Sequence, residues 1–453
     1  MKPIAVDLFC GAGGMSEGII QAGFHIVFSS DINEYVEKTY TNRHEQLGLI
    51  QGLNTFFYRK DIRELTGDDI LKKISNLEIF KDQEVPEIDV VFGGPPCQGF
   101  SNAGRRDKND PRNMLFKEYL RVINELKPKY VVMENVEGFN STKLDGFIGV
   151  SGTVYPDNSL VPNLLQVELN TIGYTTLVPK VLDASDYGVP QRRRRAIFIA
   201  YRNGQTPPNY PEPTTPEENQ KVTVLEAIGD LITDPQIKKT IDSSKSEYQV
   251  ESMKGRTKTI HGNSLPVTHS VYNHDLAQHT SSVKERFSLY KEGESVAALI
   301  NRLASGKLDL REYPSLLKDL TLKFKDSYSE EEIINSFLSG SADPVLIKAL
   351  LTKKINRYRF DRNKVAPTVV TLPDDYLIPF ENRIPTVREM ARLQSFDDSF
   401  EFLGKRTTGG SRRKIEVPQY TQVGNAVPPL LAKAVSEKIM EAIFESKKTH
   451  TLI

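Results

Sequence analysis

The chain has 453 residues, of which 38% are hydrophobic and 26% charged, so it can form two or three globular domains with a substantial core. Its 59 Lys and Arg residues balance its 59 Asp and Glu residues, and no apolar run approaches the ~20 residues of a membrane span. Two cysteines without framework spacing argue against disulfides or a zinc site, and we expect a reducing, cytoplasmic setting.

The first ~200 residues alternate strand-like and helical patterns. The first apolar run contains Asp7, so it predicts a buried strand and no signal peptide. The alternation predicts an α/β, Rossmann-like fold with a mostly parallel sheet, helices on both faces and ligands at the carboxyl ends of the strands. We expect strands at 4–9, 25–29, 90–92, 130–133 and 196–201, and helices at 15–22, 33–41 and 115–126.

A composition change marks the end of this first part. Residues 203–216 hold five prolines in 14 positions, which excludes regular structure. A helix is expected at 222–231, irregular polar sequence at 232–375, and mostly helical sequence within it at 284–352. An amphipathic helix at 428–446 is expected to pack back on the first part. We therefore expect a first domain at 1–203, a smaller irregular domain at 204–417 and a final segment at 418–453 that packs back on the first domain.

Three cation clusters stand out in this neutral chain, at 192–195, 353–364 and 405–414. Charge runs are usually solvated faces. Because each cluster lies near a loop rather than along a helix, we interpret them as candidate phosphate contacts.

Cys97 follows a short apolar run and the turn Gly93-Gly-Pro-Pro96. Glycines let the backbone approach a ligand closely, and consecutive prolines stiffen the loop. This pattern favours a nucleophile held on a rigid loop. The alternative is a buried structural thiol, which is the commoner fate of a free cysteine, but these flanks are poor core-formers.

A glycine-rich turn follows the first strand, with the pattern Gly11-x-Gly13-x-x-Ser16. It is typical of a loop for an adenosine-type cofactor, but it lacks the third glycine of the dinucleotide fingerprint, so a nicotinamide dehydrogenase remains an alternative. Asp31 ends the next apolar run, and Asp61 follows a further loop. Either carboxylate could contact a cofactor or simply cap a helix.

Two further motifs border strands. Glu134 ends an apolar strand, where a carboxylate is costly without partners, so we favour a site residue over an exposed loop residue. The run Gln191-x-Arg193-x-Arg195 precedes the strand at 196–201. Alternation along a strand is expected to place these three side chains on one side.

Together these motifs resemble those of the DNA (cytosine-5)-methyltransferase family, of the bacterial restriction–modification type. The matches span residues 4–435 in the family's order, with the long variable gap in the expected place. The resemblance implies a catalytic and cofactor-binding domain at 1–203, a target-recognition domain at 204–417 and a segment at 418–453 that completes the first. The six matching motifs lie at 7–14, 94–101, 134–136, 191–195, 383–396 and 422–429.

The resemblance also implies S-adenosyl-L-methionine as the cofactor and no metal. Phe9 would pack on the adenine, Asp31 would bind the ribose hydroxyls and Asp61 the adenine amine. Two residues depart from the family pattern, which usually has a small residue at Cys10 and the longer Glu at Asp31. The glycine-rich loop and the closing motif would complete the pocket through Gly11, Gly13, Pro96, Asn425 and Val427.

The implied catalytic residues are Cys97, Glu134, Arg193 and Arg195. A Cys97 thiolate would add to carbon 6 of cytosine and make carbon 5 nucleophilic. Glu134 would hydrogen-bond the ring, and the two arginines would supply positive charge. The base must first leave the duplex stack.

The implied partner is double-stranded DNA, bound by a monomer without an obligate protein partner, with any cognate endonuclease acting separately. Residues 101–112 would form a mobile loop that closes behind Cys97, and residues 204–415 would read base edges and grip phosphate. The expected DNA contacts are Gln98, Ser101, Arg105, Arg106, Gln191, Arg412 and Arg413.

Three alternatives were weighed against this prediction. Some tRNA-methylating proteins share the motif set but carry a Cys-Phe-Thr motif in the recognition region, whereas this chain has no Cys after Cys97. RNA enzymes of another class need a second active-site cysteine, and Cys10 lies in the cofactor loop. A catalytically inactive regulator would not need the intact set of catalytic motifs.

Overall fold

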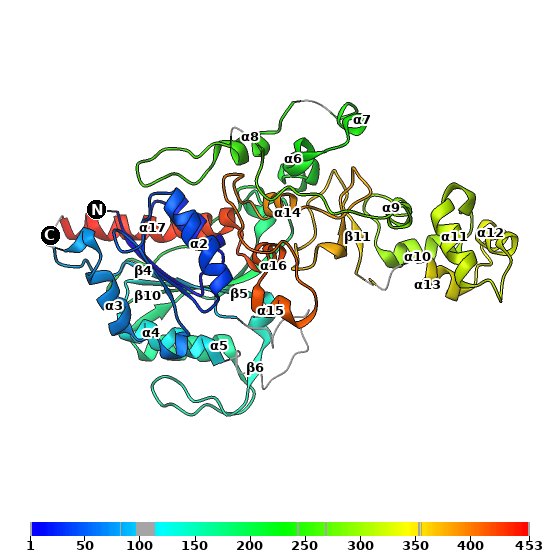
Figure 1. Cartoon of the computed structure of the whole chain (residues 1–453). Helices are drawn as coiled ribbons and strands as arrows, with labels where there is room; N and C mark the ends of the chain where they lie inside the picture. Colours follow the sequence, from blue (N-terminus) through cyan, green and yellow to red (C-terminus); the bar gives the residue numbers. More distant parts are fainter. Residues whose placement is uncertain are drawn as a thin grey trace.

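The structure, a computed structural model, describes residues 2–81, 83–96, 114–241, 244–267, 270–351, 354 and 356–451. A sheet flanked by helices forms the main body, and a smaller helical lobe projects from one side of it (Figure 1). The N- and C-terminal ends lie close together at the opposite side of the main body.

The main sheet has the strand order β3-β2-β1-β4-β5-β10-β8, with β9 pairing to β10. Strands β1 to β5 of this order are parallel, and β10 runs antiparallel to β5, β8 and β9. The prediction of a mostly parallel sheet is confirmed; β3, β8 and β9 were not expected. The bounds are β1 (Ile4–Leu8), β2 (His25–Asp31), β3 (Phe56–Arg59), β4 (Val90–Gly93), β5 (Tyr130–Val136), β8 (Tyr174–Thr176), β9 (Lys180–Asp183) and β10 (Arg194–Arg202).

Helices cover both faces of this sheet. One apolar core joins it to α3 (Gly67–Ser75), α4 (Leu115–Leu126) and α5 (Val161–Thr171). The other joins it to α1 (Gly14–Gln21) and α17 (Pro429–Thr451). A Cβ added at Gly18 would lie 2.5 Å from Ala432 Cβ, so α1 and α17 pack almost backbone to backbone. The last helix of the chain thus belongs to the same layer as the first.

A third apolar core lies beyond the sheet edge. It joins α6 (Val224–Ile228), α8 (Glu247–Lys254), α14 (Val387–Leu393) and α16 (Gln419–Asn425), and it includes Ala12 of the glycine-rich loop. The second half of the chain is therefore packed directly against the loop after β1. Helix α2 (Glu34–Gln46) follows β2. Further short elements are α7 (Pro235–Lys238), α15 (Arg413–Glu416), β6 (Lys143–Leu144), β7 (Ser159–Leu160), β11 (Tyr358–Arg359) and β12 (Tyr376–Leu377).

The projecting lobe confirms the helical character expected for residues 284–352. Its own core also includes Leu377 and Ile384, which lie outside its helices and join it to the main body. The helices are α9 (Ser281–Ser288), α10 (Val296–Ala304), α11 (Pro314–Lys323), α12 (Glu330–Ser339) and α13 (Pro344–Leu350).

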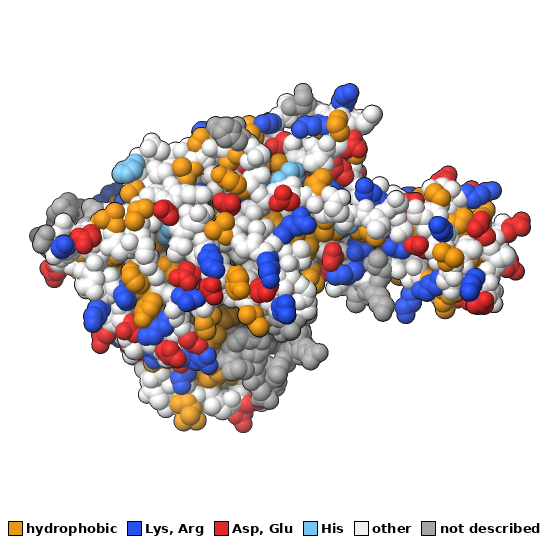
Figure 2. Space-filling view, in the orientation of Figure 1, with side chains coloured by type: hydrophobic (Ala, Val, Ile, Leu, Met, Phe, Trp, Pro, Cys, Tyr) orange, Lys and Arg blue, Asp and Glu red, His pale blue; other side chains and the backbone are white. Residues whose placement is uncertain are grey.

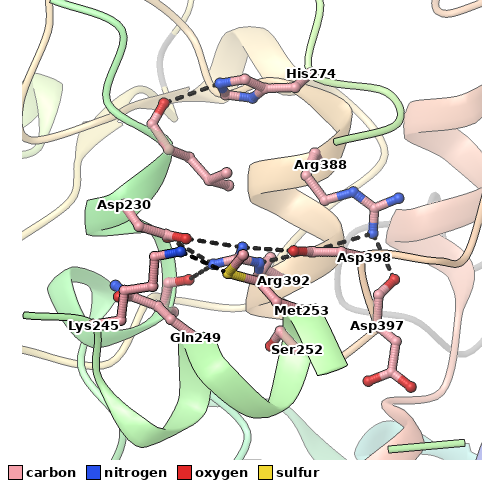
Figure 3. Close-up of polar contacts among 12 residues, drawn as sticks. Asp230, Lys245, Gln249, Ser252, Met253, His274, Arg388, Arg392, Asp397 and Asp398 are labelled. Carbon is pink, nitrogen blue, oxygen red and sulfur yellow. Dashed lines mark hydrogen bonds and ion pairs between the residues drawn. The ribbon is translucent and has the colours of Figure 1, made fainter. Parts of the chain in front are cut away.

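A buried charge cluster fixes α14 in place (Figure 3). Arg392 is fully buried between two carboxylates, with Nη2 2.7 Å from Asp398 Oδ2 and Nη1 2.7 Å from Asp230 Oδ1. Arg388, also fully buried, donates from Nη1 to the backbone carbonyl of Asp397 (2.8 Å). Through these contacts the motif at 383–396 is joined to Asp230, which precedes it by more than 150 residues, and to the turn at Asp397 and Asp398 directly after it. Across the described ranges, no helix is long and apolar enough to cross a membrane.

Candidate active site

The carboxyl ends of four parallel strands meet at one edge of the sheet. Leu8 pairs with Ser30 of β2 and Gly93 of β4, and Gly93 pairs with Met133 of β5. The next residue of each strand is a candidate site residue: Phe9, Asp31, Gly94 and Glu134. Chain positions far apart are thus brought to one level of the sheet, where ligands of such folds bind.

The turn after β1 has an open backbone. Phe9, Gly11 and Gly13 all have positive φ, at 57°, 54° and 98°, which winds the chain into the start of α1. A Cβ at Gly11 would meet nothing within 4 Å, so a ligand can approach this backbone closely. Asp31 Oδ2 accepts from the Gly11 amide (3.1 Å) and thereby braces the turn. Burial raises the pKa of the Asp31 carboxyl.

A buried hydrogen-bonded group lies beneath this turn. The Ser16 hydroxyl donates to Asp7 Oδ2 (2.5 Å), and Tyr40 Oη lies 3.1 Å from the same hydroxyl. Burial raises the pKa of Asp7 to about 7. Cys10 is buried in a small cluster with Tyr40 and Phe57, and burial raises its thiol pKa. Cys10 therefore lines the turn as a protonated, packed side chain.

Asp61 and Ile32 differ in what their side chains contact. Asp61 caps the short helix 62–64 through the Arg63 amide (3.0 Å) and pairs with the Arg63 side chain, which lowers its pKa. Its contacts are thus those of the capping alternative. Ile32 was missed at the sequence level; its side chain is 63% exposed directly after Asp31. The sequence feature that could have pointed to Ile32 is an apolar residue directly after Asp31, the acidic residue that ends β2.

The closing motif reaches the glycine-rich turn. A Cβ at Gly14 would lie 2.9 Å from Ala426 Cβ, so only glycine allows this approach. Asn425 is exposed at the end of α16, and Val427 is half-buried. Pro96, half-buried, ends the described part of the turn after β4.

Glu134 and Arg195 form an ion pair at this edge. Arg195 Nε lies 2.7 Å from Glu134 Oε1, and each side chain is 12% exposed. A Cβ at Gly94 would lie 3.3 Å from Glu134 Oε2, so the carboxylate faces the turn after β4. Asn135 Nδ2 donates to the Pro95 carbonyl (3.1 Å) and ties that turn to β5. The structure therefore fixes a paired carboxylate beside the chain that leads into Cys97.

Gln191 and Arg193 are more deeply buried than Arg195: Gln191 is fully buried and Arg193 is 2% exposed. Burial, aided by the nearby Arg195 charge, lowers the pKa of Arg193. Strand β10 begins at Arg194, so residues 191–193 do not follow its alternation. The DNA contact of Gln191 and the catalytic role of Arg193 stay predictions.

The cation clusters also differ from expectation. In the second cluster Arg357 and Arg359 are buried, and Arg362 pairs with Glu292 (2.9 Å), so these charges are used within the protein. In the third cluster Arg412 is exposed and Arg413 half-buried. Figure 2 shows basic and acidic side chains interspersed over the main body in this view.

Several sequence-level candidates lie outside the described residues. The expected loop at 101–112 and part of the second cation cluster are among them. The individual candidates are Cys97, Gln98, Ser101, Arg105 and Arg106.

Comparison with known proteins gives the class of this site. A family model described as C-5 cytosine-specific DNA methylase matches residues 4–441. The type II methyltransferase M.DdeI of Desulfomicrobium norvegicum is 32% identical, over 96% of this chain and 88% of its own. The type II methyltransferase M1.HphI of Haemophilus parahaemolyticus is 31% identical, over 96% and 86%.

A solved structure shows the same fold. It is a prophage-encoded protein from E. coli described as a DNA modification methyltransferase, with a TM-score of 0.60, 21% identity and coverage of 98% of this chain and 99% of its own. The fold and the motif order thus define a methyltransferase. The chain belongs to the C-5 cytosine-specific DNA methylase family and is a DNA (cytosine-5) methyltransferase.

Proposed function

We propose that the chain transfers a methyl group from S-adenosyl-L-methionine to carbon 5 of cytosine in a specific duplex sequence, by attack of Cys97 on carbon 6 of a flipped-out base. One observation carries this proposal: the Glu134–Arg195 ion pair lies beside Gly94, in the turn that leads into Cys97. A paired, largely buried carboxylate is what recognition of a cytosine ring requires there.

The residues after β1 and β2 fit the cofactor. The open Gly11 backbone can take the amino-acid end, and the Asp31 carboxylate at the end of β2 can accept from ribose hydroxyls. Exposed Ile32 offers an apolar face to adenine, and Asn425 stands at the end of α16. When bound, the cofactor supplies the methyl group from a positively charged sulfonium.

The protein's own residues make the cytosine reactive. Carbon 5 is a poor nucleophile until the Cys97 thiolate adds to carbon 6 and turns the ring into an enamine. Glu134 can share a proton with ring N3 and accept from the exocyclic amine, which stabilises the charge that appears on attack. Arg195 holds that carboxylate in place. After methyl transfer a base removes the carbon-5 proton and the thiolate leaves.

Purified protein with labelled S-adenosylmethionine should methylate duplex DNA, and Cys97→Ser should abolish turnover. Cys10→Ala is the matched control, because Cys10 is the other cysteine and lines the turn after β1. A duplex with 5-fluorocytosine at the target should trap a covalent adduct with the wild-type chain. Normal turnover by Cys97→Ser would overturn the mechanism.

We further propose that the exposed Arg412 and the half-buried Arg413 contact phosphate. Replacing both by Ala should make the plot of log affinity against log salt concentration shallower by about two units, and weaken binding equally for all sequences. An unchanged slope would remove both residues from the DNA interface.

The setting proposed is protection of host DNA in a restriction–modification system, by a monomer acting in the cytoplasm, where chromosomal DNA is accessible. The names of the relatives M.DdeI and M1.HphI support this setting. Bisulfite sequencing of DNA from expressing cells should show one methylated sequence context. Scattered methylation without a shared context would contradict it.

A further inference from the structure

Residues 366–371 form a return segment, which brings the chain back from β11 toward the active site. It lies alongside the residues before β10: the Ala366 amide donates to the Pro190 carbonyl and the Arg192 amide to the Ala366 carbonyl, both at 2.9 Å. The Thr368 hydroxyl donates to the Arg192 carbonyl (2.6 Å). The return segment thus runs beside the residues that lead into β10, the strand that carries Arg195.

Gln191 uses its whole amide to hold this arrangement. Its Oε1 accepts from the Val369 amide (2.9 Å), and its Nε2 donates to the Leu393 carbonyl (2.8 Å) and to Gln394 Oε1 (2.7 Å). The side chain is fully buried. Each of its polar atoms is therefore committed to another segment of the protein.

Gln394 and Arg193 continue these contacts to the closing motif. Gln394, also fully buried, donates from Nε2 to the Val423 carbonyl (2.8 Å). Arg193 donates to the carbonyls of Val369 and Gly424, both at 3.0 Å. A Cβ at Gly424 would lie 2.7 Å from a backbone amide of the return segment, so α16 rests on it directly.

We propose that Gln191 and Gln394 are positioning residues that hold the strand start of Arg195, the return segment and the end of α16 as one unit. Both side chains are fully buried and bond other parts of the protein. The inference rests on the proposed function for one point, that Asn425 at the end of α16 faces the cofactor. It predicts that disturbing either glutamine weakens cofactor binding and slows methyl transfer together.

The size of the effect follows from the hydrogen bonds. Replacing one glutamine by Met keeps the volume but leaves buried backbone groups and the other amide without partners, which is costlier than losing the bonds alone. We expect a loss of about tenfold in cofactor affinity and in single-turnover rate for each single variant. Because the two amides share one bond, the double variant should lose less than the product of the single losses.

The test uses Gln191→Met, Gln394→Met and the double variant in the full chain. The dissociation constant of S-adenosylhomocysteine is measured by calorimetry, and the methyl-transfer rate in a single turnover at saturating cofactor and DNA, below the unfolding temperature. Gln249→Met is the matched control. Gln249 is a buried glutamine of α8 that donates to the Leu225 carbonyl and accepts from the Ser246 amide, and it belongs to none of the motifs assigned to the cofactor or the base.

Each outcome decides the inference. It is supported when both single variants lose affinity and rate while the control loses only thermal stability. It is overturned when they unfold earlier, like the control, but bind and react as the wild type does. Should a single variant not fold, the double variant, which removes both ends of the shared bond, gives the answer. A wild-type chain that binds no S-adenosylhomocysteine would instead contradict the proposed function.

Discussion

Replacing Arg195 by Met isolates the contribution of one ion pair to catalysis. Arg195 Nε lies 2.7 Å from Glu134 Oε1, and its Nη1 also donates to a backbone carbonyl (2.8 Å), so the guanidinium is held at two points. Met keeps the length and apolar contacts of the side chain but removes the charge and the donors. The Glu134 carboxylate then loses the partner that orients it toward the turn after β4.

The expected loss follows from the strength of a charged hydrogen bond. Such a bond contributes about 1.5–3 kcal/mol, and ~1.4 kcal/mol changes an equilibrium or rate tenfold. We therefore expect kcat/KM for cytosine methylation to fall roughly 10- to 150-fold, most of it in kcat, because the carboxylate acts on the charge that appears during attack.

Arg202→Met is the matched control for this change. Arg202 lies on the same strand, pairs with Glu87 and donates to the Lys127 carbonyl (2.8 Å), but it is seven residues further along β10. At ~3.3 Å per residue it is about 23 Å from the active site. Incorporation of labelled methyl groups into a duplex measures both variants. Turnover within threefold of wild type for Arg195→Met, or an equal loss for Arg202→Met, would refute the reasoning.

Three further predictions concern stability. Arg392→Met leaves the Asp398 and Asp230 carboxylates without their cation, and we expect the free energy of unfolding in urea to fall by about 3–5 kcal/mol. Adding Asp398→Leu should recover part of this loss, because it removes one of the unpaired carboxylates. Purely additive losses in the double variant would contradict this. Gly18→Ala should lower thermal stability by about 1–3 kcal/mol, because the new Cβ would lie 2.5 Å from α17; an unchanged melting temperature would show that the helices separate freely. Burial raises the pKa of Asp7 from 3.8 to about 7, so between these pH values the folded chain holds a proton that the unfolded chain releases. The stability that this group contributes is therefore fully present below about pH 4 and is lost as the pH rises through about 7. Asp7→Asn should therefore flatten the fall of melting temperature between about pH 4 and about pH 7 in calorimetry, and an identical fall in both proteins would rule Asp7 out as its source.

The sheet could largely be predicted because its central strands are locally encoded. The runs ending at Leu8, Gly93 and Met133 are short, apolar and rich in β-branched residues, which is sufficient to indicate buried parallel strands. The missed strands β3, β8 and β9 span only three or four residues. Strands that short form because a neighbouring strand pairs with them, and no local periodicity reports that pairing.

The candidate site was predicted unevenly for a related reason. Glu134 was found because a carboxylate at a strand end is unusual in itself. The deep burial of Gln191 and Arg193 could not be predicted, because their surroundings come from residues about 175–235 positions away, at Val369, Gln394 and Gly424. Whether a polar side chain serves a ligand or a buried backbone carbonyl depends on which distant segment reaches it.

The sequence by itself determined the class of chemistry. The turn after each strand is a local property of glycine and proline, so the motifs could be read in order without knowing how the strands pair. The tertiary structure decided which member of Gln191-x-Arg193-x-Arg195 pairs with Glu134. Strand β10 begins at Arg194, and its antiparallel pairing with β5 places Arg195 against Glu134, while the two residues before the strand are covered by the return segment and α16.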